Sequence, residues 1–158
     1  RSGEKTFQLL TQVSGRAGRA GKKGKVIIQT YEPENNVIKD SKEENYELFY
    51  NREINSRKIF LYPPFSKILN IGFSSEDEER LLDISKKFYD EIKSQDIELY
   101  GPMPSMVYKV QKRYRMNIFA KGSRAKIDMF KRYLKKKLDE FNDGKVRIVV
   151  DIDPINLM

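Results

Sequence analysis

Two arginines set three residues apart, with a glycine before each, make the stretch of this sequence best suited to chemistry. It runs from Gln12 to Arg19 and reads Gln-Val-Ser-Gly-Arg-Ala-Gly-Arg. On a helix, Arg16 and Arg19 would share one face, and each guanidinium keeps its charge and offers a planar fork of donors to phosphate oxygens. Gly15 and Gly18 remove side chains that would block a close approach. Donors fixed in this way stabilise the charge that develops during phosphoryl transfer. The alternative is a basic, glycine-rich surface loop.

The same stretch resembles motif VI of superfamily 2 helicases. The longer run from Lys5 to Tyr31 resembles the PriA (primosomal protein N′) family of bacterial replication restart helicases. Three later signatures fit this family in the same order, namely Tyr62-Pro63-Pro64-Phe65, Arg113-Tyr114-Arg115 and Asp151-Ile152-Asp153-Pro154. The resemblance implies that the full-length protein is an ATP-dependent 3′–5′ DNA helicase. Such an enzyme recognises stalled or abandoned replication forks and restarts replication by primosome assembly.

The resemblance also implies roles for the residues of the first stretch. Arg19 would be the arginine finger, Arg16 would lie beside it, and Gln12 would orient the reacting groups. Gly15 and Gly18 would complete the ATP contact. No Gly-x-x-x-x-Gly-Lys-Ser/Thr phosphate loop occurs in this sequence, so we expect the segment alone to be inactive as an ATPase. ATP and Mg²⁺ would bind the full-length protein, and a cysteine-bound zinc would lie upstream of this segment.

Composition narrows the class of protein. The 158 residues contain no Cys and no His, which excludes disulfides and Cys/His zinc sites in this segment and fits a cytoplasmic protein. No apolar run approaches the roughly 20 residues that span a bilayer, so we expect no membrane partner. The net charge is +8, and residues 101–158 carry 14 basic and 6 acidic side chains. A basic last third favours nucleic acid as a partner.

The elements expected from periodicity give an α/β (α+β) class in three parts. Residues 1–41 read as a helix over 4–19 and a buried strand over 25–31, the tail of a RecA-like helicase lobe. Residues 42–64 read as a connecting helix that the Tyr62-Pro63-Pro64-Phe65 turn ends. Residues 65–158 read as β-α-β-β-α-β, the ferredoxin-like split βαβ plan, with a loop at 101–104.

A cluster of cations around one tyrosine marks the turn between the second and third of these strands. It consists of Lys109, Lys112, Arg113, Tyr114 and Arg115. Cations beside an aromatic ring suit phosphates and a stacked or unpaired base. We therefore expect this hairpin to bind branched DNA by structure rather than by sequence, the alternative being an exposed charged hairpin. The lysine-rich outer face of the last helix is equally compatible with DNA contact and with solvation.

Two further readings concern partners. Ser123 and Arg124 open the last helix, where free amides favour an anion. The resemblance implies recruitment by the acidic tail of single-stranded DNA-binding protein and by other primosome proteins, with Arg124 as the anchor for that tail.

Asp151 and Asp153 share a strand face, but structural pairing is a better explanation for them than a metal site. The alternative function is a non-enzymatic RNA- or ribosome-binding module of ferredoxin-like fold, which does not need the first 31 residues.

Overall fold

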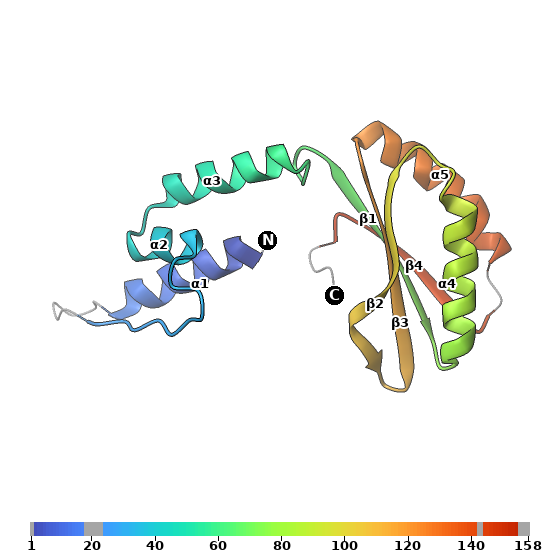
Figure 1. Cartoon of the computed structure of the whole chain (residues 1–158), viewed down its shortest axis with the longest axis horizontal. Helices are drawn as coiled ribbons and strands as arrows, with labels where there is room; N and C mark the ends of the chain where they lie inside the picture. The colour runs from blue at the N-terminus through green and yellow to red at the C-terminus, as the bar shows by residue number, and fades with distance from the viewer. Residues whose placement is uncertain (1, 18–23, 142–143, 155–158) are drawn as a thin grey trace. The chain divides into compact units, whose positions relative to one another are not determined.

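The computed structural model describes residues 2–17, 24–141 and 144–154. Its contacts divide the chain into two compact units, Arg1–Ile59 and Phe60–Met158. The described part of the first unit is helical, and the second unit combines helices with a four-stranded antiparallel sheet (Figure 1). The chain therefore has the mixed α/β class that the sequence predicts.

Three helices make up the described part of the first unit, namely α1 (Ser2–Ala17), α2 (Asn36–Lys42) and α3 (Tyr46–Ile59). The rings of Phe7 in α1 and Phe49 in α3 stack with their centroids 4.4 Å apart, and both side chains are buried. Arg57 of α3 joins the same two helices, because its Nη2 lies 3.1 Å from Glu4 Oε2 and 2.8 Å from Glu53 Oε1. An aromatic stack and a small ion-pair network thus hold α1 against α3.

Two sequence predictions for this unit are wrong. Residues 24–31 form no strand, and the Ile27 side chain is 81% exposed rather than buried. An isolated β-branched run needs a neighbouring strand for its backbone hydrogen bonds, and the four described strands pair with one another in the second unit. The helix predicted from residue 42 starts at Tyr46 and follows α2, whose seven residues are too few to show a hydrophobic period.

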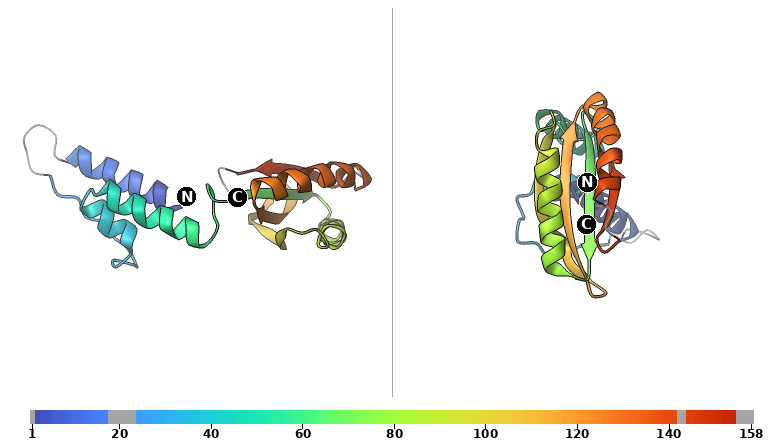
Figure 2. Two further views of the ribbon diagram at one scale, coloured as in Figure 1. Left: turned by 90° about the horizontal axis from the view of Figure 1, so that it is seen from above. Right: turned by 90° about the vertical axis from the view of Figure 1, so that its right-hand side faces the viewer.

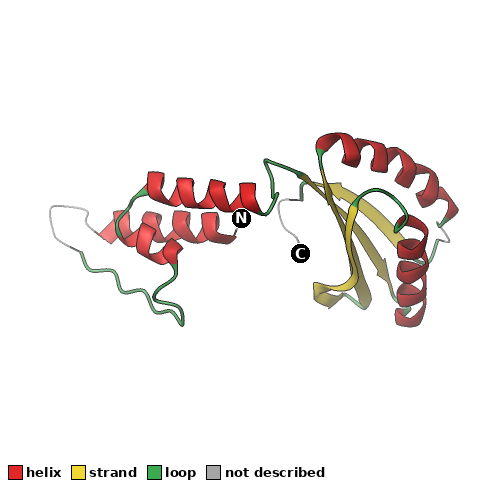
Figure 3. Ribbon diagram, turned by 45° about the horizontal axis from the view of Figure 1, so that its top comes forward, coloured by secondary structure: helices red, strands yellow, loops and turns green. Residues whose placement is uncertain are grey.

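The second unit has the predicted order of strands and helices. Its elements are β1 (Lys67–Ser75), α4 (Glu78–Ile92), β2 (Glu98–Val110), β3 (Arg113–Gly122), α5 (Arg124–Glu140) and β4 (Arg147–Ile152). The strands lie in the order β2-β3-β1-β4, and every neighbouring pair is antiparallel (Figure 3). Strands β1 and β3 are therefore central, and β2 and β4 form the edges.

Both helices of this unit cover the same face of the sheet. In the right-hand view of Figure 2 they lie side by side, with strands visible between them. Each helix begins at a capping side chain: Asp77 Oδ1 accepts from the Arg80 amide at 3.0 Å, and Ser123 Oγ accepts from the Lys126 amide at 3.3 Å. Ser75, two residues before the Asp77 cap, lies in β1, where its hydroxyl accepts from the Asp77 amide and donates to the Lys145 carbonyl.

The core lies between the helices and one face of the sheet. Its fully buried members alternate along the central strands and recur every third or fourth residue along the helices, as the sequence pattern predicts. They include Leu69, Ile71 and Phe73 of β1, Leu81, Phe88 and Ile92 of α4, Ile118 of β3, and Ile127 and Leu134 of α5. None of the described helices is long and apolar enough to cross a lipid bilayer.

The loop predicted at residues 101–104 belongs to β2 instead. This strand continues through Gly101 and Pro104, with irregular register between Tyr100 and Met103 and between Pro104 and Lys109. Proline lacks a backbone N–H, so a sheet tolerates it on an edge strand and at bulges. The turn residues in this stretch therefore mark bulges rather than the end of a strand.

Candidate functional site

The helical part of the first arginine-glycine stretch presents its polar residues to solvent. Gln12 and Arg16 lie four residues apart in α1, so their side chains share one face, and both are exposed. Phe7 on the opposite face fixes the orientation of the helix by its stack on Phe49. The other two residues of the predicted ATP contact, Gly18 and Arg19, lie outside the described residues.

Gly15 occupies open space. A Cβ atom built at this position meets nothing within 4 Å. Glycine inside a helix costs about 0.5–1 kcal/mol relative to alanine, and no contact within the described residues offsets that cost. Packing among the described residues therefore gives no reason for a glycine at this position, which fits a close approach by another molecule or domain.

The same outer face of α1 carries apolar side chains. Leu9 is 61% exposed and Val13 is 52% exposed. By helical spacing both lie on the side that holds Gln12 and Arg16. A face that mixes a cation, an amide and exposed aliphatic groups is suited to cover by another surface, whereas a fully solvated face is more often charged throughout.

The hairpin between β2 and β3 turns at Gln111 and Lys112. Both have positive φ angles, 46° and 67°, as a two-residue hairpin turn with the right twist requires. Lys112 is consequently at the tip and is exposed. The turn sets the register of the four remaining residues of the predicted cluster.

Strand alternation separates those residues onto two faces. Tyr114 lies opposite buried Ser75 and faces the helix side, whereas Arg113 and Arg115 face the other side. Lys109 lies opposite Tyr114, with its Nζ 4.2 Å from the ring centroid and 2.7 Å from the hydroxyl oxygen. The structure therefore brings the lysine and the tyrosine together as one pair and the two arginines together as another.

The Tyr114 ring is partly covered. The Tyr108 ring lies 5.5 Å from it, and the Tyr108 hydroxyl donates to Glu78 Oε1 at 2.8 Å. That hydrogen bond raises the pKa of Tyr108 above its ordinary value. Tyr114 also packs against the edge of the core. Its predicted contact with DNA would accordingly pass through Lys109, whose ammonium it positions.

Arg113 is anchored to the end of β1. Its Nη2 donates to the Ser74 carbonyl at 3.0 Å, and its Nη1 lies 3.8 Å from Glu76 Oε1. Arg115 lies directly opposite Ser74 in the strand register. The backbone of β1 thus holds the Arg113 guanidinium, and Arg115 lies at the same end of the sheet.

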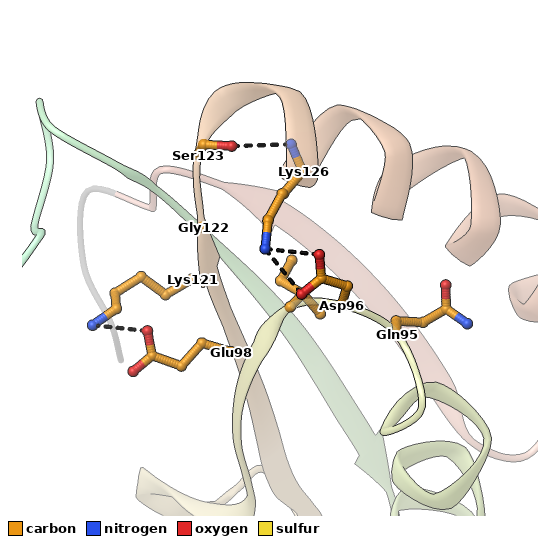
Figure 4. A pocket seen from close by; sticks show the side chains of 8 residues that line it. Gln95, Asp96, Glu98, Lys121, Gly122, Ser123 and Lys126 are labelled. Atoms are coloured by element: carbon orange, nitrogen blue, oxygen red, sulfur yellow. Dashed lines mark hydrogen bonds and ion pairs between the residues drawn. The ribbon is translucent and has the colours of Figure 1, made fainter.

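At the N-terminus of α5, Arg124 is exposed and makes no ion pair with the described residues. A neighbouring pocket of about 450 Å³ is lined by residues of 95–98 and 121–126, and Arg124 is not among them. The charges in this pocket are already paired, because Lys121 Nζ lies 3.2 Å from Glu98 and Lys126 Nζ lies 2.8 Å from Asp96 (Figure 4). An anion at this end of the helix would therefore meet Arg124 outside the pocket.

The lysine-rich face of α5 is partly neutralised. Lys137 Nζ lies 2.7 Å from Glu140 and 3.0 Å from Glu91, and these two carboxylates raise the pKa of Lys137 well above its usual range. Lys135 and Lys136 remain exposed. Just after β4, Asp153 forms an ion pair with Lys67 and accepts from the Ile68 amide at 3.1 Å. This confirms structural pairing for Asp153, whereas for Asp151 it stays a prediction.

One arrangement was missed by sequence reasoning. Lys121 of β3 places its Nζ 5.5 Å from the centroid of the Tyr62 ring and 5.7 Å from that of Tyr100. Tyr62 belongs to the motif that was interpreted only as a turn. Nothing in the local spacing could have revealed the contact, because the three residues come from separate parts of the chain and meet only after folding.

Comparison with known proteins gives a consistent result over the whole chain. The family model described as the primosomal protein N C-terminal domain matches residues 58–155. The chain is similar to the replication restart protein PriA of Bacillus subtilis, with 36% identity over 163 residues that cover 100% of this chain and 20% of the relative. The PriA proteins of Borreliella burgdorferi and Synechocystis sp. are 35% and 30% identical, over 100% and 99% of this chain. The chain spans only about a fifth to a quarter of the length of these relatives.

Proposed function

This chain belongs to the primosomal protein N C-terminal domain family, and on that premise we propose that it is the C-terminal part of an ATP-dependent 3′–5′ DNA helicase. The enzyme would recognise stalled or abandoned replication forks in the cytoplasm and restart replication by primosome assembly. The observation that carries this proposal is the similarity to replication restart proteins over essentially the whole chain, including the first unit. An RNA- or ribosome-binding module would not need that unit.

The first unit would contribute to ATP hydrolysis. Gln12 and Arg16 are held on the exposed face of α1, and exposed aliphatic residues beside them suit cover by the lobe that binds the triphosphate. Arg19 would act as the finger, Arg16 would support it, and Gln12 would orient the attacking group. Gly15 and Gly18 would let the nucleotide approach. ATP and Mg²⁺ would be bound mainly by upstream parts of the enzyme, and zinc would bind there as well.

The second unit would bind branched DNA. Its element order and its strand order β2-β3-β1-β4 support the ferredoxin-like plan. Lys112 at the hairpin tip and the neighbouring pair Arg113 and Arg115 would contact phosphates. Lys109 would do the same from the other face, with Tyr114 setting its position. These contacts would be to the phosphate backbone of the DNA, so recognition would follow the shape of the fork rather than its sequence.

Arg124 would provide a contact for a protein partner. Its exposure at the N-terminus of α5 supports binding of an acidic, carboxylate-ended segment such as the tail of single-stranded DNA-binding protein. Other primosome proteins would join the same assembly.

The decisive experiment measures ATP hydrolysis by the full-length enzyme that contains this chain. Arg16→Ala and Arg19→Ala should lower the DNA-stimulated rate far more than they weaken ATP binding, because a finger acts on the transition state. Loss of a finger is worth on the order of a thousandfold in rate. Lys58→Ala, which removes an exposed cation from α3, is the matched control and should hydrolyse ATP normally. Near-normal rates in both arginine variants would refute the proposed role of the first unit.

A further inference from the structure

None of the described helices of the second unit covers the second face of its sheet, and the strand register shows which side chains lie there. We call this surface the open face. From one end to the other it carries Arg115, Ser74 and Arg147, then Met103, Asn117, Gly72 and Val149, then Tyr100, Phe119, Asn70 and Asp151, and finally Glu98 and Lys121. The first group is basic, the second is small and amide-bearing, and the third contains two rings. The order of these groups is what the inference rests on.

Two arginines flank the central strand at the first end. Arg115 of β3 and Arg147 of β4 are both register partners of Ser74. Cross-strand partners have Cβ atoms roughly 5 Å apart, so two guanidinium groups stand on either side of one serine. This end adjoins the hairpin, where Arg113 is tied to the same serine carbonyl. The basic hairpin therefore continues directly into the open face.

In the middle of the face, Gly72 carries no side chain and lies beside the buried Asn117. A Cβ atom added at Gly72 would meet only Asn117 Oδ1 at 3.5 Å and the Val149 carbonyl at 3.8 Å, which are ordinary contacts. The absence of a side chain here lets a flat group approach the backbone of the sheet. On the next row, Asn70 Oδ1 is buried without a hydrogen-bond partner among the described residues. Unpaired buried acceptors are uncommon, and rotation of this amide would let it pair with a ligand.

Aromatic rings form the next part of the face. Tyr100 and Phe119 are register partners, and Tyr100 is 43% exposed. The Lys121 ammonium lies close to both ring centroids, 5.7 Å for Tyr100 and 5.5 Å for Tyr62, and 3.2 Å from Glu98 Oε2. Tyr62, itself 49% exposed, extends the aromatic surface beyond the sheet. Rings held in place by an ammonium and by strand pairing are rigid platforms.

We propose that the open face binds single-stranded DNA, with unpaired bases stacked on Phe119 and Tyr100 and with the phosphates contacted by Arg115 and Arg147. Unstacked bases are recognised by aromatic side chains on the surface of a four-stranded sheet and by polar groups that reach the base edges. Paired bases in a duplex cannot offer their flat surfaces to these rings. The proposal rests on the proposed DNA-binding function and assigns the single-stranded part of a branched substrate to this face.

The test uses the complete 158-residue chain with a thymidine oligonucleotide, a duplex, a fork and a uridine oligonucleotide. Tyr100→Leu and Phe119→Leu keep apolar volume but remove the rings, and each should weaken single-strand binding by about five- to 150-fold. The salt dependence should stay unchanged in these two variants. Arg147→Gln should weaken binding and flatten the salt slope by about 0.7 unit, as expected for one lost phosphate contact on a single strand. Duplex binding should change little in all three.

Two matched controls are not part of the open face. Tyr31→Leu removes a fully exposed ring of the first unit, and Arg132→Gln removes an exposed cation of α5. Neither should affect the affinity for the thymidine oligonucleotide. If Phe119→Leu fails to fold, Tyr100→Leu still decides the question, because Tyr100 is 43% exposed and is not part of the hydrophobic core.

Cross-linking with a bromodeoxyuridine oligonucleotide gives an independent reading. We expect photoproducts on peptides that contain Tyr100 or Phe119. Cross-links confined to residues 109–113, equal losses on duplex and single strand, or tighter binding of the uridine oligonucleotide would each overturn the proposal. If the fork binds normally and the ring variants change nothing, the open face is excluded while the proposed function stands. If no DNA binds the chain at all, the proposed DNA-binding function fails with it.

Discussion

Replacing Gly15 by alanine should stabilise α1 in the 158-residue chain but lower the rate of ATP hydrolysis by the full-length enzyme. Alanine is favoured over glycine in a helix by about 0.5–1 kcal/mol, and a Cβ at this position meets no atom within 4 Å. The substitution should therefore stabilise α1 in the 158-residue chain by about that amount. Hydrogen exchange of the α1 amides should slow by about two- to fivefold, the equilibrium factor that corresponds to this free energy.

In the full-length enzyme the same methyl group should interfere with catalysis. If the nucleotide or the opposite lobe approaches α1 at Gly15, the added Cβ will displace the neighbouring arginines. A displacement of about 1 Å in a positioned catalytic group costs on the order of a hundredfold in rate. We expect DNA-stimulated ATP hydrolysis to fall accordingly. Loss of folding cannot explain a variant that is more stable and less active.

Gly3 offers the matched control within the same helix. A Cβ there would lie 3.5 Å from Val37 Cγ2 and 3.7 Å from Glu53 Oε2, which are ordinary van der Waals distances. Gly3→Ala should also protect α1 from exchange, and the full-length enzyme should keep its activity. The reasoning is refuted if Gly15→Ala hydrolyses ATP as fast as Gly3→Ala, because nothing would then need the space above Gly15.

Three further outcomes are expected for the second unit. Arg113→Ala combined with Arg115→Ala should weaken fork binding and flatten the salt slope by about two units. Lys135→Ala combined with Lys136→Ala should weaken fork binding less. Equal losses of affinity in titrations at two salt concentrations would indicate diffuse attraction. Tyr114→Ala should weaken fork binding no further once Lys109 is also replaced, because the ring positions that ammonium at 4.2 Å; additive losses in a double-mutant cycle would show a separate stacking role. Hydrogen bonding to Tyr100 and then to Lys121 lowers the pKa of Glu98. A depressed carboxyl pKa adds stability that is present above the unfolded value near pH 4.5 and is lost as the pH falls through the folded value. The melting temperature of Glu98→Gln should therefore lie below that of the parent at pH 6, and the difference should shrink as the pH falls through the lowered pKa of Glu98. A difference that does not change with pH would exclude this linkage.

Local patterns were sufficient for most of the second unit. The inner stripe of α4 was read from Leu81, Phe88 and Ile92 at helical spacing, and all three are fully buried. The cap of α5 at Ser123 was read from one side chain and its position, and the hydroxyl accepts the expected amide. These features depend on residues within a turn or two of each other, so a short stretch of sequence is enough to predict them.

The wrong predictions, a strand at residues 25–31 and a loop at 101–104, depend on contacts that local sequence does not contain. The run Val26-Ile27-Ile28 has strand composition, but a strand also needs a partner for its backbone groups, and composition does not supply one. Residues 101–104 have turn composition, but an edge strand absorbs prolines as bulges. In both cases the context of the sheet decided against the local propensity.

The sequence by itself determined the family, the order of the elements in the second unit and the placement of Gln12 and Arg16 on one face of a helix, because each depends on the identity and spacing of nearby residues. Only the tertiary structure decided which side chains share a surface. It separated Tyr114 from the arginines beside it through strand alternation, and it joined Arg115 to Arg147 across Ser74 through strand register. It also brought the Tyr62 and Tyr100 rings close to one ammonium, that of Lys121. Such groupings arise from pairing between segments distant along the chain, and the hydrophobic core fixes that pairing as a whole.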